Sequence, residues 1–141
     1  MSRAALGAAC LALLPGAAPV GQLDVAFTGL RSNKGMLRIC VTRRPASFPS
    51  CRDDPQAIKR NVPATATSTR FDALPTGDYA VAVIHDANGN AKLDTMLGIP
   101  KEGFGFSRNP AIGFGPPAFS SAQFPVTTGA EIQQIRIRYL L

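Results

Sequence analysis

The sequence has little of the chemistry that most catalytic and metal sites require. It contains one histidine, His85, and three cysteines among 141 residues. Cys10 lies in the N-terminal apolar run, and one histidine with the two remaining cysteines cannot form the tetrahedral shell of a zinc site. A serine-histidine-aspartate triad would have to use His85, and "GFGFS" around Ser107 is not the G-x-S-x-G nucleophile elbow. The sequence therefore carries no signature of a zinc enzyme or of a serine hydrolase.

Long apolar runs are also missing. The run from Ala4 to Leu14 follows Arg3 and precedes small residues. It is too short to cross a bilayer, and its order of charge, apolar run and small residues is that of a secretory signal. We predict that residues 1–20 are a signal peptide and residues 21–141 a single exported domain, periplasmic or secreted. No membrane span is expected in the mature chain.

Removal of this segment leaves two cysteines, Cys40 and Cys51. An even pair in an exported chain predicts a disulfide. Closing a loop of this length stabilises the fold by about 3 kcal/mol in the chain-entropy model. Two buried free thiols are the alternative.

Acidic residues are outnumbered, 9 against 15 lysines and arginines, for a net charge of +6. Such a balance can indicate an anionic partner. The basic residues are scattered, however, and no basic run is interleaved with aromatics as in nucleic-acid-binding surfaces. We interpret the excess as a solvated surface and exclude nucleic acid. The expected partner is an unknown envelope component or protein.

Helical periodicity is scarce, whereas alternating apolar and polar residues, which predict strands, recur along the chain. Residues 22–30 and 36–44 are predicted to form a hairpin around a turn at Gly35, and residues 57–74 one or two strands. Residues 78–85 are apolar on both faces of the predicted strand, as in a central strand that is buried on both sides. Residues 122–141 are predicted to form a closing pair, with a bulge between Gln133 and Ile135.

About seven short strands without a helix predict an all-β fold. A two-sheet antiparallel β-sandwich, immunoglobulin-like or transthyretin-like, is the economical arrangement. The residues expected to form its core are Leu23, Val25, Phe27, Leu37, Ile39, Val41, Phe71, Tyr79, Val81, Val83, Phe124, Val126, Ile135 and Ile137.

A long loop, residues 85–119, opens with a candidate calcium motif. In calcium loops with ligands at positions 1, 3, 5 and 9, the side chains of Asp86, Asn88, Asn90 and Asp94 fall in register, and position 7, Lys92, offers its carbonyl. Position 12 is Leu97 where a bidentate Glu belongs, so Glu102 would have to fold back as the last ligand. The alternative is a structural turn, because Asp and Asn side chains hydrogen-bond their own backbone in such segments. No other cofactor is expected.

The second half of the loop concentrates aromatic residues between glycines. Two interpretations are open. The segment could be a plug that caps one end of the sandwich core, or Phe104, Phe106 and Phe114 could wall a groove for an apolar or carbohydrate ligand.

The leading functional hypothesis is a non-enzymatic binding or structural module of the cell envelope. The alternative is an envelope hydrolase that uses His85, Asp86 and Glu102 as an acid–base set, since paired carboxylates can do such work when their environments separate their pKa values.

The stretches "LPTGDYAVAVIHDANGNAKLDTMLGIPKEGFGFSRN" and "GPPAFSSAQFPV", with "GMLRICVT" and "FPSC" upstream, resemble a bacterial family, domain of unknown function 2141. The resemblance covers about residues 22–141. It implies an exported β-sandwich with no established activity. One position departs from the family pattern: Ala91 stands where the family has glycine, and alanine resists the positive φ of a tight loop.

Overall fold

A computed structural model of the protein describes residue 4 and residues 7–8, 16–91, 95–96 and 99–141. Most of this chain is extended. The strands are β1 (Val20–Thr28), β2 (Met36–Thr42), β3 (Ile58–Pro63), β4 (Ser68–Pro75), β5 (Gly77–Asp86), β6 (Thr95–Met96), β7 (Ile99–Pro100), β8 (Gly103–Phe106), β9 (Phe124–Val126) and β10 (Ala130–Arg136). The helical segments are short, a 3₁₀ turn η1 (Pro45–Ser47) and α1 (Phe119–Ala122).

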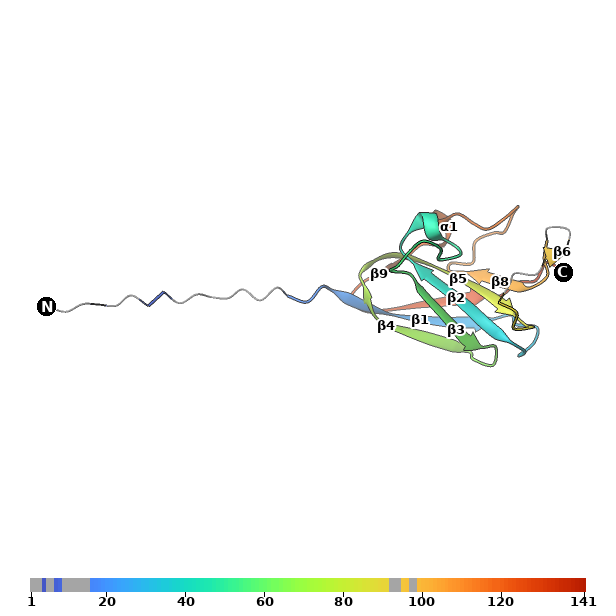
Figure 1. The fold of residues 1–141 in the computed structure, drawn as a ribbon, viewed down its shortest axis with the longest axis horizontal. Coiled ribbons are helices and arrows are strands. Elements are labelled where there is room, and N and C mark those ends of the chain that lie inside the picture. Colours follow the sequence, from blue (N-terminus) through green and yellow to red (C-terminus); the bar gives the residue numbers. More distant parts are fainter. Residues whose placement is uncertain (1–3, 5–6, 9–15, 92–94, 97–98) are drawn as a thin grey trace.

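Two sheets face each other, as Figure 1 shows. One has the strand order β10-β1-β4, and the other the order β3-β2-β5-β8 with β9 also paired to β5. The predicted β-sandwich is confirmed. One pair departs from the antiparallel expectation, because β10 runs parallel to β1 while the other described pairs are antiparallel.

The space between the sheets holds the hydrophobic core, and every residue predicted for it is buried there. Alternation explains this result. Successive side chains of a strand point to opposite faces, so Leu37, Ile39 and Val41 of β2 meet the inward side chains of β5, such as Val81 and Val83.

A second apolar cluster covers the outer face of the five-stranded sheet. β5 contributes Ala80 and Ala82 to it, so this strand is buried on both faces, as predicted for a central strand. Cys40 and Cys51 lie in the same cluster and form the predicted disulfide, with Cα atoms 5.7 Å apart. The bridge ties the loop after β2 onto this face.

Two predicted strand pairings are wrong. Strands β1 and β2 do not form a hairpin, because they lie in different sheets. Between β1 and β2 the chain crosses from one sheet to the other. Gly35 lies just before β2 with a φ of 74°, and its close approach to the backbone of Asp86 and Ala87 leaves no room for a Cβ. Likewise β9 and β10 are not a closing pair, since β9 pairs with β5 and β10 with β1.

The predicted bulge near Gln133 is also wrong. β10 pairs with β1 without interruption from Ala130 to Arg136. Ile132 is 64% exposed, on the solvent face, while Ile135 is fully buried. No change of phase is needed, because the side chains of Glu131 and Gln133 take the half-buried inward positions of this strand.

The long loop is more regular than predicted. β8 lies within it and extends the five-stranded sheet beside β5, and β6 pairs with β7. The aromatic segment does not cap the end of the core, because Phe104 and Phe106 belong to the outer cluster instead. In the described part of the chain there is no helix long and apolar enough to cross a membrane.

Candidate functional site

The candidate calcium motif begins at the last residue of β5. The Asp86 side chain is fully buried and accepts a hydrogen bond from Nε of Arg38 on β2, at 2.7 Å. Its two carboxylate oxygens also accept the backbone N–H groups of Asn90 and Ala91, at 3.2 and 2.8 Å. Asp86 therefore fastens both the neighbouring strand and the turn that follows it.

These contacts also set the charge of the carboxyl group. Burial alone would raise the pKa of Asp86. The Arg38 guanidinium and the amide donors of Ala91 and Asn90 outweigh that effect and hold the pKa below its ordinary value of 3.8. Asp86 is thus an anion paired within the fold at neutral pH.

The turn after Asp86 has the character of an Asx-rich loop. The Asn88 side-chain oxygen accepts the N–H of Asn90 at 3.2 Å, and the N–H of Gly89 donates to the carbonyl of Asp86 at 3.3 Å. Ala91 adopts a φ of 59° despite its Cβ. Its N–H bond to Asp86 holds it in this conformation, which for a residue other than glycine costs on the order of 1 kcal/mol.

The motif is only partly within the described residues, because Lys92 and Asp94 lie outside them. Glu102 is buried just before β8, and the pairing of His85 with Gly103 brings it to the end of β5 that carries Asp86. No group of three or more His, Cys, Asp or Glu side chains arranged to hold a metal ion occurs within the described ranges. Calcium binding thus stays a prediction.

His85 lies on the opposite side of the strand from Asp86, facing the core, and is 1% exposed. Its Nε2 lies 2.7 Å from the carbonyl oxygen of Lys34, and its Nδ1 lies 2.7 Å from the hydroxyl of Tyr139. A carbonyl can only accept, so Nε2 carries the proton and, in the neutral ring, Nδ1 accepts from the tyrosine. Both ring nitrogens are engaged in the fold.

The serine considered for catalysis is also held by hydrogen bonds within the fold. Ser107 is fully buried, and its hydroxyl donates to the carbonyl of Ala122 at 2.6 Å and accepts the N–H of Val81 at 2.9 Å. His85 and Asp86 point to opposite faces of β5. The set proposed for a hydrolase is therefore not gathered around a common space, and the hydrolase alternative is unsupported.

The aromatic segment starts in β8, where phenylalanines alternate with glycines. Phe104 and Phe106 point to the outer face, and the Phe106 ring contacts that of Phe48 with centroids 5.8 Å apart. On the inner face, a Cβ at Gly105 would lie 2.7 Å from both the Arg136 carbonyl oxygen and the Ile135 side chain. The glycines let the C-terminal strand, which is the end of β10 and its continuation (residues 135–138), pass directly behind β8.

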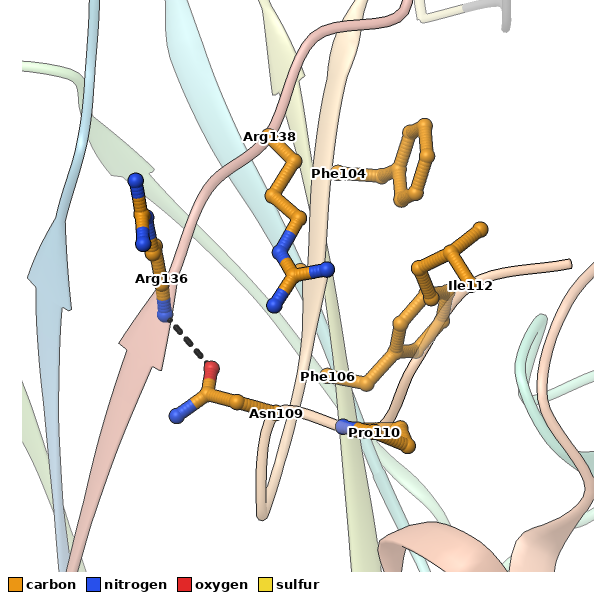
Figure 2. A pocket seen from close by; sticks show the side chains of 8 residues that line it. Phe104, Phe106, Asn109, Pro110, Ile112, Arg136 and Arg138 are labelled. Atoms are coloured by element: carbon orange, nitrogen blue, oxygen red, sulfur yellow. Dashed lines mark hydrogen bonds between the residues drawn. The ribbon is translucent and has the colours of Figure 1, made fainter.

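A shallow hollow lies where β8 meets this C-terminal strand, as Figure 2 shows. The backbones of Phe104 and Arg138 exchange hydrogen bonds of 3.0 and 2.8 Å, and the Arg138 guanidinium extends over the hollow. Ile112 and Pro110 form its far side. The free space is about 10 Å³, which is about enough for one water molecule.

The structure brings together only two of the three phenylalanines predicted to wall a groove. Phe104 and Phe106 line the hollow, whereas Phe114 stands clear of it in solvent. Sequence reasoning missed Arg138 and Asn109. The signal for Arg138 was present in the alternation that continues past Ile135 and Ile137, but this arginine was counted among scattered surface charges.

A family model described as an uncharacterized protein conserved in bacteria, DUF2141, matches residues 25–134. The chain belongs to this family. The DUF2141 match runs from within β1 to within β10, so it spans the Asp86 turn and most of the residues that line the hollow. Neither the curated proteins nor the solved structures give a match.

Proposed function

We propose that the protein is an exported, non-enzymatic β-sandwich module that binds a component of the cell envelope. The observation that carries the proposal is that the groups best suited to acid–base or nucleophilic work serve the fold. His85, Asp86 and Ser107 are all buried, and each is hydrogen-bonded to neighbouring elements. A catalytic base instead needs to reach a substrate proton.

Export is supported by two features. The Cys40–Cys51 disulfide is of a kind that persists in oxidising compartments. The first 20 residues have the composition of a signal peptide.

The test has two arms. Cells that express the full chain are fractionated, and we expect the mature protein outside the cytoplasm, shortened near residue 20, with the disulfide formed. The purified protein is then compared with Asp86→Asn and Glu102→Gln on a broad hydrolase panel. Cytoplasmic retention would overturn export. An activity that both variants lose would overturn the non-enzymatic proposal.

A second candidate function is weak calcium binding by Asp86, Asn88, Asn90, Asp94, the carbonyl of Lys92, and Glu102. It is favoured by the position of Glu102 at the end of β5 that carries Asp86. Few charged ligands imply a Kd of about 10⁻⁴–10⁻³ M. Calorimetry and thermal shift with millimolar calcium, on wild type and Asp86→Ala, test it. A wild type that calcium does not stabilise would leave this segment as a structural turn.

A further inference from the structure

Phe114 is the most exposed large hydrophobic residue among those that the structure describes, with a relative exposure of 112%. Glycines flank it on both sides, and Gly115 has a φ of 86°. A Cβ at Gly113 or Gly115 would meet no atom within 4 Å, so the neighbouring backbone stands as free as the ring. The loop between β8 and α1 projects beyond the sheets in Figure 1.

The base of this loop is held firmly, in contrast to its tip. Asn109 donates from Nδ2 to the carbonyl of Gln134 at 2.8 Å. It also accepts the N–H of Arg136 at 2.9 Å, the bond that is dashed in Figure 2. Ile112 packs against the outer aromatic cluster. The sandwich therefore fixes the loop in place and presents one aromatic ring to solvent.

The segment from β8 to the C-terminus is basic. Residues 103–141 contain Arg108, Arg136 and Arg138 but a single acid, Glu131. Glu131 accepts a hydrogen bond from Gln133, at 3.0 Å, on the half-buried side of β10. The structure gives the Arg138 guanidinium no hydrogen bond or ion pair with any residue that it describes. Arg108 uses one guanidinium donor on the carbonyl of Gln123, at 3.3 Å, and keeps the others. Arg138 and the remaining donors of Arg108 are thus available to an anionic partner.

We propose that this loop docks the protein on a membrane surface that contains anionic lipid. The Phe114 ring enters the headgroup region, and Arg108 and Arg138 face lipid phosphates. Apolar side chains that enter the interface, together with basic residues that meet anionic lipid, hold interfacial helices on a membrane without spanning it, and the same two contributions act here. This inference rests on the proposed function and names the envelope component.

The shape of the surface favours a membrane over a folded partner. The hollow beside Arg138 has about 10 Å³ of free space and would not accept a side chain of a second protein. A bilayer needs no preformed pocket, because its headgroup region rearranges around the ring. Each arginine near an anionic surface strengthens binding about fivefold, and one buried aromatic ring about tenfold or more. The contact is therefore weak, reversible and sensitive to salt.

The absence of tryptophan from the chain provides a direct reporter. Phe114→Trp places the sole indole at the tip of the loop, and Ile132→Trp places it on the solvent face of the three-stranded sheet. With vesicles of phosphatidylglycerol and phosphatidylcholine, we expect a blue shift of the emission for the first variant and none for the second. A shift that is equal for both, or absent for Phe114→Trp, would overturn the proposal.

Co-sedimentation of the exported protein with the same vesicles measures the affinity. We expect binding to fall about tenfold for Phe114→Ser and about fivefold for Arg138→Gln, with no change for the matched control Ile132→Ser. High salt should release the protein. Equal binding to pure phosphatidylcholine vesicles would overturn the proposal. If vesicles fail but an envelope extract depleted of lipid still binds the protein, the envelope function stands and only this inference falls.

Discussion

The carboxylate of Asp86 connects three parts of the structure, the strands β5 and β2 and the turn up to Ala91. Asp86→Asn keeps the size of the side chain but removes the charge that pairs with Arg38. Because the lost partner leaves a half-buried guanidinium uncompensated, we expect unfolding to become easier by about 2–3 kcal/mol. Urea titration at pH 7 measures this, with the exposed Asp78→Asn as the control expected to change by less than about 0.5 kcal/mol.

The difference in stability between wild type and Asp86→Asn should depend on pH, and the sign of this dependence follows from the lowered pKa of Asp86. A carboxyl group whose pKa is lower in the folded than in the unfolded state stabilises the fold above its ordinary pKa, and this contribution is lost as the pH falls through the folded value. The gap between wild type and Asp86→Asn should be constant from pH 6 to 8 and shrink below about pH 4. A gap that persists undiminished at pH 2 would show that charge is not its cause.

At the scale of single elements, β8 depends on its two glycines because the C-terminal strand lies against them. Gly105→Ala would bring a Cβ within 2.7 Å of the Arg136 carbonyl oxygen, a backbone atom that cannot turn aside. We expect a loss of about 1–3 kcal/mol, as for other overpacked sites. Gly113→Ala, which meets nothing within 4 Å, is the matched control. Equal midpoints in urea for the two variants would contradict the close packing.

The disulfide acts on another element, the loop that follows β2. Replacing Cys40 and Cys51 together by alanine frees this loop in the unfolded chain, and the chain-entropy model predicts a loss of about 3 kcal/mol. The loop also covers the outer cluster through Phe48, so Phe106 should become more accessible. Thermal unfolding of the double variant measures the loss of stability, and binding of an apolar dye to the folded variant measures the exposure of the outer cluster. Mass spectrometry of non-reduced wild-type protein tests the bridge itself, and alkylation of two free thiols in exported wild-type protein would contradict it.

Strand pairing shows where sequence reasoning ends. Alternation placed Leu23, Val25 and Phe27 on an inward face, and they are buried. Alternation did not predict which strands pair with β1, because an inward apolar face is equally well buried whichever sheet the strand belongs to. The residues of β8 were expected to lie in a long loop, and glycine does weaken a strand in isolation. The pairing of β8 with β5 depends on how closely the C-terminal strand approaches, which no local pattern contains.

The candidate site divides in the same way. The Asx-rich turn after Asp86 was one of two readings of the local sequence, and its backbone hydrogen bonds are local. Arg38, which pairs with the Asp86 carboxylate, is 48 residues away in the sequence. Similarly, Phe104 and Phe106 were recognised from the aromatic segment, whereas Arg138 reaches the hollow only because the C-terminal strand bridges to β8. Contacts between distant segments were the part that could not be predicted.

At the scale of the whole molecule, the two ends of the folded chain hold each other. β1 is the central strand of its sheet, paired with β4 on one side and with β10 on the other. Parallel pairing of the first and last long strands means that neither half of the chain can complete this sheet alone. The domain should therefore unfold in one cooperative step.

This arrangement defines where the domain must begin. Residues 16–19 are exposed, although the carbonyl of Pro19 accepts the N–H of Thr76 at 3.2 Å. Leu23, by contrast, is fully buried and pairs with both Phe71 and Glu131. We expect deletion of residues 2–17 to leave the urea midpoint unchanged. Deletion of residues 2–24 should prevent folding, because it removes a core side chain and the ladder bonds of the first half of β1, a loss of at least about 3 kcal/mol. Far-ultraviolet circular dichroism during urea titration distinguishes the two variants, and unfolding of the shorter deletion would place part of the first 17 residues inside the domain.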